Sequence, residues 1–324
     1  MTTLEEIRRP VSKEMKSFQK SFRDSVHSDV RLLNIVTSYI LRNKGKQIRP
    51  LLVFLTAKMV REITPSTYTA ATLIELLHTA TLIHDDVVDV SYQRRNKFSV
   101  NAIWKSKIAV LMGDYFLARG LLHSVRNNDH VLLDIVSDAV KEMSEGELLQ
   151  LQKSRSLNIN TETYYDVIRK KTATLLASCT ASGAKSAGAG QDEIDRMYEM
   201  GINLGMAFQI KDDLLDYQSS RVIGKPAGND IKEKKFTLPL IYSLNQSDPA
   251  EKRSIIRMIR NGRLQRDRIE YIMDFVKRHG GLIYAEEKMN EFKDHALSML
   301  DSYSESEARN SLADLIRFIT ERKK

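Results

Sequence analysis

Leu-Ile-His-Asp-Asp-Val-Val-Asp, residues 82–89, places three carboxylates (Asp85, Asp86 and Asp89) inside an apolar run that begins at Ala70. No proline or glycine interrupts this run, which predicts a helix. On a helix Asp85 and Asp89 lie one turn apart on the same face, with Asp86 beside them. These like charges repel and cannot be buried unpaired, so the segment needs a cation. Magnesium fits, because it typically joins one or two carboxylates to a substrate phosphate.

The same spacing returns far downstream. Residues 209–216 read Gln-Ile-Lys-Asp-Asp-Leu-Leu-Asp, which places Asp212, Asp213 and Asp216 behind the apolar run 202–210. One such motif could be a solvated acidic patch on a surface helix. Two copies, each behind an apolar run, are better explained by two facing helices that clamp a diphosphate through several metal ions.

The composition favours a large helical protein. The 324 residues suffice for one large domain or two ordinary ones. Apolar residues make up 42% and charged residues 28% of the chain, as in a soluble globule with a real core. No proline occurs between Pro65 and Pro226, which favours long uninterrupted helices over strands and turns.

Several features bear on location and partners. No run approaches the roughly 18 apolar residues that span a bilayer, and residues 1–10 lack the apolar segment of a signal peptide. The lone cysteine, Cys179, cannot form an internal disulfide, which fits a reducing cytoplasm. The net charge of +8 suits nucleic acid or a small polyanionic substrate. Because the basic residues are spread along the chain, we expect no nucleic-acid partner. Because no apolar run is long enough, we expect no integral membrane segment.

A turn at residues 43–50 carries two cations just before the apolar helix predicted at 51–60. Gly45 is expected to end the preceding helix in a left-handed conformation. Lys46 and Arg49 would then lie beside the exposed amide groups of a helix N-terminus, which favour an anion. The alternative is a basic loop in water.

Further cations accompany the first acidic motif. His78 lies seven residues before Asp85, about two helical turns away on the same face. Arg94 and Arg95 follow the motif in a polar connection. These arginines could pair with the carboxylates or hold phosphate oxygens in bidentate fashion.

Cations also surround the second motif. One of Lys170 and Lys171, on a helix predicted at 161–180, is expected to point inward. The polar segment 224–239 includes Lys225 and Lys235, and it is either a mobile surface loop or a lid that closes over a bound anion. A helix predicted at 131–152 carries Glu-Gly-Glu-Leu-Leu-Gln at residues 145–150.

Together these motifs resemble the trans-isoprenyl diphosphate synthase (polyprenyl synthetase) family, in that family's order and spacing over roughly residues 30–320. The resemblance implies an all-α isoprenoid synthase fold, a single domain across residues 1–324, which is normally a homodimer with three magnesium ions. It implies head-to-tail condensation of isopentenyl diphosphate onto an allylic diphosphate. The motifs that carry it are Gly45–Pro50, His78–Asp89, Arg94-Arg95, Lys171-Thr172-Ala173, Phe208–Asp216 and Lys235–Pro239.

The resemblance also implies roles for individual residues. The implied metal ligands are Asp85, Asp89 and Asp212, supported directly or through water by Asp86, Asp213 and Asp216. The residues implied to hold isopentenyl diphosphate are Lys46, Arg49, His78 and Arg95. Those implied to hold the allylic diphosphate are Arg94, Lys171, Gln209, Lys225 and Lys235. Thr172 and Gln209 are implied to lie near the developing cation, and the expected catalytic residues are Arg94, Lys171, Thr172, Gln209 and Lys235.

Two positions depart from the family pattern. Asn96 stands where glycine usually follows the arginine pair, and Lys234 stands where glycine often precedes the lid lysine. Both changes could alter loop shape, and neither removes a charge that the chemistry needs.

Product length in the family depends on the residues four and five places before the first motif, which here are Thr81 and Ala80. Neither is aromatic, and Leu77, Leu73 and Met112 are candidates for a deeper tunnel floor. Because Ala80 lies about 7.5 Å down the helix from Asp85 and leaves the path open, we expect a product of about C30 or more. With residues 145–150, this resembles long-chain synthases that supply quinone side chains.

Other functions remain open. A farnesyl or geranylgeranyl diphosphate synthase, with a C15 or C20 product, would share the same site. A terpene cyclase shares the all-α fold and one acidic motif, but usually lacks the 46–49 turn and the second motif. A non-catalytic helical partner subunit would not need both motifs intact.

Overall fold

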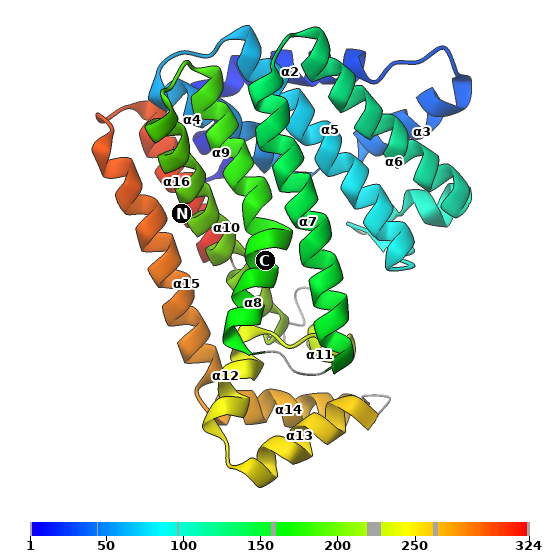
Figure 1. Ribbon diagram of the computed structural model, residues 1–324, viewed down its shortest axis with the longest axis vertical. Coiled ribbons are helices and arrows are strands. Elements are labelled where there is room, and N and C mark those ends of the chain that lie inside the picture. The colour runs from blue at the N-terminus through cyan, green and yellow to red at the C-terminus, as the bar shows by residue number, and fades with distance from the viewer. Residues whose placement is uncertain are drawn as a thin grey trace.

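The computed structural model describes residues 2–43, 45–95, 97–156, 160–218, 228–261 and 265–322. Its regular structure is almost entirely helical, as the sequence predicts (Figure 1). The first half of the chain forms α1 (Leu4–Arg8), α2 (Ser12–Ser25), α3 (Arg31–Arg42), α4 (Ile48–Val60), α5 (Pro65–Val88), α6 (Val100–Arg126) and α7 (His130–Ser156). The second half forms α8 (Thr161–Ile168), α9 (Thr174–Ser186), α10 (Gln191–Asp216), α11 (Asn229–Lys232), α12 (Leu238–Gln246), α13 (Pro249–Asn261), α14 (Arg266–Arg278), α15 (Gly281–Ser298) and α16 (Glu307–Glu321).

Long helices form the body of the molecule. Figure 1 shows α7, α9, α10 and α15 running roughly along its long axis, with α13 and α14 crossing at one end. The segment 50–57 of α4 is buried on every face, as expected for a helix that is apolar all round and packs inside a bundle. Buried side chains form two apolar clusters, and α9 and α10 contribute to both.

The contact between α9 and α10 is unusually close because small residues face each other. A Cβ added to Gly201 would lie 2.4 Å from the Cα of Ala177, and one added to Gly205 would lie 2.3 Å from the Cα of Ala173. Only glycine leaves room for backbones at that distance. The position of one helix along the other is therefore fixed by main-chain contact.

The helix predicted at 161–180 is interrupted, which is a difference from the sequence expectation. Residues Arg169–Ala173 form a π-helical turn between α8 and α9. Gly146 of α7 lies against this turn, because a Cβ there would meet the Lys171 amide nitrogen at 2.9 Å. Inserted π turns redirect side chains and recur at functional sites.

The connection between α5 and α6 contains a short hairpin. Strands β1 (Gln93–Arg94) and β2 (Lys97–Phe98) pair antiparallel, with Arg94 opposite Lys97. Arg95 at the turn has a positive φ of 54°.

The expectation that Gly45 ends a helix in the left-handed region is wrong. The residue with positive φ in that turn is Gln47, at 49°. Gly45 instead lies against the guanidinium of Arg95, whose Cζ would be 2.4 Å from an added Cβ. Glycine is needed there for close approach, since any side chain would displace the arginine.

Helix α6 alone, within the described residues, is long and apolar enough to span a membrane, which the run-length expectation had not anticipated. About a third of its most apolar stretch (33%) is buried, and it packs along α5, where Gly113 meets the imidazole of His84. Non-helical angles at Lys105 kink it near its start. It is a partly buried core helix with one exposed apolar face.

Candidate active site

Both acidic motifs lie at the C-terminal ends of helices. Asp85 and Asp86 are in the last turn of α5, and Asp89 is its C-cap. The second motif likewise fills the last turn of α10, which ends at Asp216. The negative end of the helix dipole points toward these carboxylates and adds to their mutual repulsion. Each helix end therefore requires positive charge.

Part of that charge at the first motif comes from the hairpin. Arg94 Nε donates to Asp86 Oδ1 at 2.9 Å, and the Asp86 side chain is almost fully buried. Burial raises the pKa of Asp86, and the Arg94 charge opposes this shift. The first of the two sequence interpretations for Arg94, pairing with a carboxylate, is realised here.

Asp85 faces the centre of the site. Its side chain is exposed by surface area, yet crowding around the carboxylate still raises its pKa. The charge of Lys171 is the main opposing influence, whereas Glu147 of α7 raises the same pKa. Lys171 and Glu147 are therefore the charged residues that act most strongly on Asp85.

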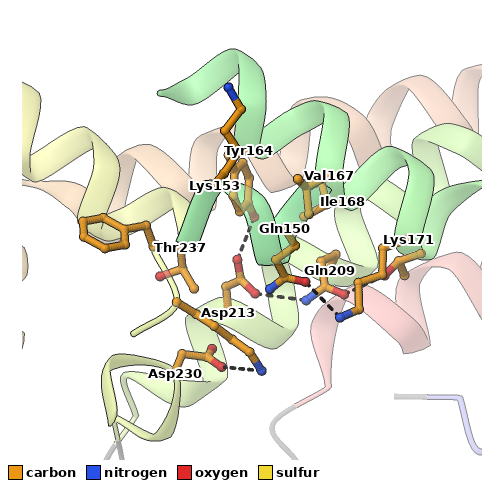
Figure 2. Close-up of a pocket in the computed structure, with 13 residues that line it drawn as sticks. Gln150, Lys153, Tyr164, Val167, Ile168, Lys171, Gln209, Asp213, Asp230 and Thr237 are labelled. Atoms are coloured by element: carbon orange, nitrogen blue, oxygen red, sulfur yellow. Dashed lines mark hydrogen bonds and ion pairs between the residues drawn. The ribbon is translucent and has the colours of Figure 1, made fainter. Parts of the chain in front are cut away.

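Asp213 of the second motif is buried in a hydrogen-bonded pocket (Figure 2). Tyr164 OH donates to its Oδ2 at 2.7 Å, and Gln209 Nε2 donates to its Oδ1 at 3.0 Å. Burial raises the pKa of Asp213 to about 7, with the Asp230 and Asp212 charges acting in the same direction. A carboxylate with so high a pKa lies where positive charge is favoured.

The other two carboxylates of this motif have different partners. Asp212 pairs with Arg322, whose guanidinium lies over the Phe208 ring, 4.6 Å from its centroid. Asp216 accepts the backbone N–H groups of Asn229 and Asp230, each at 3.0 Å, and so caps the start of α11.

A cavity of about 170 Å³ adjoins Asp213, between α7, the π turn, α8 and the segment 230–237 (Figure 2). Thr172 Oγ1 donates to Gln209 Oε1 at 2.9 Å in its wall. Lys171 lines the same cavity, as the inward-pointing lysine expected from the sequence. Lys235 also lines it and pairs with Glu233 at 2.6 Å.

Two lysines connect the first acidic motif electrostatically to the segment that follows the second. The Lys171 charge lowers the pKa of both Asp85 and Glu233. The charges of Glu233, Asp230 and Asp89 all raise the pKa of Lys235. The end of α5 and the segment after α10 therefore face a common space.

A second cavity, of about 100 Å³, gathers the predicted anion-binding residues His78, Arg94 and Arg95 beside Gly45. His78 is half-buried and lines this cavity, and burial lowers its pKa well below the usual value, with the charges of Arg49, Arg95 and Arg94 acting in the same direction. The Nε of Arg49 is buried without a hydrogen-bond partner. Such a concentration of guanidinium groups suits a polyanion.

The remaining predicted residues have more varied positions. Lys46 Nζ lies over the Phe318 ring, 5.3 Å from its centroid, and the Lys46 carbonyl accepts from Arg8. Lys225 and Asn96 lie outside the described residues. Lys234 has a positive φ of 58°, which is where glycine would be easier to accommodate.

The proposed chain-length residues lie in a different layer. Ala80, Leu77, Leu73 and Met112 are buried in the first apolar cluster, to which α5 and α6 both contribute. Thr81 is half-buried, and its hydroxyl donates to the His78 carbonyl at 2.9 Å. Neither of the two cavities described above is lined by Ala80 or Thr81.

The donor set fits a hard divalent cation. Every candidate ligand is a carboxylate oxygen, and burial raises the pKa of Asp85, Asp213 and Asp216, as expected where a compensating cation would bind. Within the described residues no three acidic, histidine or cysteine side chains converge into a protein-only metal cage. That pattern suits magnesium, which keeps waters and binds through few carboxylates plus substrate phosphates.

A family model described as polyprenyl synthetase matches residues 30–276, most of the chain. The chain belongs to the polyprenyl synthetase family. It is 33% identical over 320 residues to octaprenyl diphosphate synthase from Escherichia coli (strain K12), covering 98% of this chain and 99% of that protein. The predicted family is thereby confirmed.

Solved structures agree with this membership. A decaprenyl diphosphate synthase from Rhodobacter capsulatus matches with a TM-score of 0.93 and 33% identity, over 99% of this chain and 100% of that one. A polyprenyl synthase from Caulobacter crescentus CB15, complexed with calcium and isoprenyl diphosphate, matches with a TM-score of 0.91 and 31% identity, over 99% and 98%. The predicted isoprenoid synthase fold is confirmed.

The protein is a polyprenyl diphosphate synthase, a prenyltransferase of isoprenoid biosynthesis. Enzymes of this polyprenyl synthetase family use divalent metal ions, isopentenyl diphosphate and allylic diphosphates. Geranylgeranyl pyrophosphate synthases also occur among the similar solved structures. Family membership alone therefore leaves product length open.

Several residues of this polyprenyl synthetase site carry no simple sequence signal. Tyr164, Asp230 and Glu233 surround Asp213 and Lys235 only once the chain has folded. Arg322 reaches Asp212 from the other end of the sequence. The charged run after the second motif could have suggested Asp230 and Glu233, but not their partners.

The low pKa of His78 predicts a pH effect on stability. Because the folded state binds this proton less well than the unfolded state, stability should be fully present above the unfolded pKa near 6.5 and fall at lower pH. We expect His78→Gln to reduce this dependence by up to about 1.4 kcal/mol per pH unit between pH 6.5 and 5. Denaturant unfolding of the substrate-free protein measures it, with exposed His130→Gln as control. Equal slopes in wild type and His78→Gln would contradict the argument.

Proposed function

We propose that this enzyme condenses isopentenyl diphosphate head-to-tail onto an allylic diphosphate and makes a long all-trans polyprenyl diphosphate. The observation that carries the reaction is that carboxylates of both motifs surround Lys171 and Lys235. Both lysines line the cavity with Asp213, the Lys235 charge lowers the pKa of Asp216, and the first motif interacts with Lys171 through Asp85 and with Lys235 through Asp89. The carboxylates and a bound diphosphate are both anionic, so both need the lysines and bound metal ions.

Ionisation of the allylic substrate is the step that this site would promote. Breaking the allylic C–O bond leaves a carbocation and a diphosphate whose charge grows as the bond stretches. Bound divalent ions would stabilise that growing charge. We assign their ligation to Asp85, Asp89 and Asp212, and expect three magnesium ions.

The other motif carboxylates fit supporting roles. Asp86 accepts from Arg94, Asp213 accepts from Tyr164 and Gln209, and Asp216 caps α11. Each is already held by protein donors in a defined orientation. We assign them to orient the ligands or to bind the ion through water. Asp212 also has a protein partner, Arg322, and is assigned to the ion because of its place in the family motif.

We assign the allylic diphosphate to the cavity beside Asp213. Lys171 and Lys235 line it and can donate to phosphate oxygens. We also assign Arg94, which lines the other cavity, and Lys225, which lies outside the described residues, to this ligand. Thr172 and Gln209, which hydrogen-bond to each other at 2.9 Å, present oxygen atoms toward the carbon centre. These dipoles would favour the allylic cation without trapping it as a covalent adduct.

We assign isopentenyl diphosphate to the arginine-rich cavity. Arg95 and His78 line it, the Arg49 charge acts on His78 from outside the lining, and Lys46 lies on the turn that carries Gly45 and Gln47. Burial and three nearby guanidinium groups keep His78 neutral, so it can offer one N–H as a donor. The new bond would form where this cavity meets the allylic one, and the released diphosphate can accept the final proton.

A long product, of about C30 or more, is supported by the small side chains along α5, where Ala80 lies about 7.5 Å from Asp85. The similarity to an octaprenyl and a decaprenyl diphosphate synthase also supports a long product. Quinone side chains are the expected use. A C15 or C20 product is the alternative.

A homodimer is supported by the exposed face of α6. The apolar side chains that lie on it are Ile103, Val110, Leu111, Leu121, Leu122 and Val125. They recur at helical spacing, and Leu148 and Leu151 of α7 are exposed as well. Water-exposed apolar surface of this extent is typical of an interface, here with a second copy in the cytoplasm.

The reaction is tested with farnesyl diphosphate, labelled isopentenyl diphosphate and magnesium. We expect the purified chain to incorporate label by itself. Asp85→Asn and Asp212→Asn should each lower kcat by at least about a hundredfold, because a metal ion that stabilises the leaving diphosphate loses a carboxylate ligand. A terpene cyclase would incorporate no label. A non-catalytic partner subunit would be inactive alone, and either result would refute the proposal.

Product length is tested by filling the space on α5. We expect Ala80→Phe, and the less crowded Thr81→Phe, to shorten the longest products resolved by reversed-phase chromatography. Overpacking a buried site costs about 1–3 kcal/mol, so thermal unfolding must first show that each variant is folded. A folded, active variant with unchanged product length would contradict the tunnel assignment.

The dimer is tested by charging the α6 face. We expect Leu121→Asp with Val125→Asp to convert the protein to a monomer in light scattering, because two desolvated carboxylates oppose association. Ile283→Asp, at an exposed apolar residue of α15, is the matched control and should not dissociate it. A monomeric wild type would contradict the assignment directly.

A further inference from the structure

The segment 145–150 of α7 has no part in the assignments above, yet it lies directly against the π turn. Gly146 allows this approach, since an added Cβ would lie 2.8 Å from Lys170 Cβ and 2.9 Å from the Lys171 nitrogen. Close backbone packing brings the acidic side chains on either side of Gly146 within reach of the two lysines.

Each lysine has its own partner on α7. Lys171 Nζ forms an ion pair with Glu147 and donates to Gln150 Oε1 at 2.9 Å (Figure 2 shows the second bond). Lys170 Nζ pairs separately with Glu145 at 3.3 Å. Of Lys170 and Lys171, only Lys171 lines the cavity beside Asp213. An ammonium has three N–H donors, so two bonds to α7 leave one for a ligand.

Lys171 also lies under the influence of a second carboxylate. Its charge is the largest influence lowering the pKa of Asp85, and Glu147 acts on Asp85 in the opposite sense. The charges therefore alternate from α7 to α5, as carboxylate, ammonium and carboxylate. Without Glu147, Asp85 and Glu233 would remain as carboxylates that attract the flexible lysine.

We infer that Glu147 and Gln150 are positioning residues that hold the Lys171 ammonium on the α7 side of the cavity and away from Asp85. This inference rests on the proposed function, because it takes Asp85 as a metal ligand and Lys171 as a diphosphate ligand. A lysine paired with Asp85 would compete with a divalent cation for the same oxygens. The α7 pair keeps both groups available at once.

The test measures binding of inorganic pyrophosphate by calorimetry at increasing magnesium concentration, with no prenyl substrate present. We expect Glu147→Gln to raise the half-saturating magnesium concentration about tenfold, as for other residues that orient a metal ligand. Gln150→Leu should raise it in the same direction by a smaller factor. Glu145→Gln removes the neighbouring Lys170 pair and is the matched control, expected to change nothing.

A double-mutant cycle identifies the route of the effect. If Glu147 acts by holding Lys171, then Glu147→Gln should have no effect in the Lys171→Ala background, where the competing ammonium is gone. An equal rise in both backgrounds would mean that Glu147 acts on the ion directly, and would overturn the inference. Unchanged magnesium dependence in folded Glu147→Gln and Gln150→Leu would overturn it as well.

Failure of the proposed function gives a different result. In that case wild type would not bind pyrophosphate in a magnesium-dependent way, or Asp85→Asn would bind it as well as wild type. Thermal unfolding of every variant separates these outcomes from loss of folding. Farnesyl diphosphate KM provides a second readout, which should rise in Glu147→Gln and recover with excess magnesium.

Discussion

Concentrated negative charge at two helix ends is the constraint on which the rest of this structure depends. The carboxylates of each motif share a turn, and the helix dipole adds to their repulsion. Burial then raises the pKa of Asp85, Asp86, Asp213 and Asp216. Every cation in the vicinity reduces that cost, and a metal-bound diphosphate would reduce it further.

The fold supplies those cations from distant parts of the chain. Arg94 comes from a hairpin, Lys171 from a π turn, Lys235 from the segment before α12, and Arg322 from beyond α16. Arg94, Lys235 and Arg322 pair with carboxylates in this structure. In the proposed reaction some of these groups would bind metal ions or diphosphate instead. An apolar bundle can place charges this way because its rigidity comes from packing and does not depend on the ion pairs.

Much of this architecture could be predicted from the sequence. The proline-free apolar runs predicted the long helices, and the two Asp-Asp-x-x-Asp motifs lie at the ends of two of them, α5 and α10. His78 and Arg95, expected to share one anion site, line the same cavity, whereas Arg94, expected with the other diphosphate, lines it too, and Lys46 and Arg49 do not. The predictions of the helices and of the motif positions are correct because they depend on local periodicity or on spacing along one helix.

Features that depend on contacts between segments could not be predicted. The π turn at Lys171 is accompanied by the close approach of Gly146, which no pattern within residues 161–180 encodes. Gly45 was assigned a role in backbone conformation, whereas the observed reason is the Arg95 guanidinium beside it. Membrane-like composition in α6 was missed for a related reason, because charged residues divide a stretch whose average is apolar.

The main-chain seam between α9 and α10 limits how such a protein can diversify. Gly201 and Gly205 touch the backbone of the facing helix, which locks Thr172 and Gln209 in the same relative position. Any larger side chain at the seam would shift that pair, so evolution has little freedom on this wall. The buried residues of α5 and α6, such as Ala80 and Met112, are not among the atoms that crowd either glycine, so substitutions there leave this seam intact.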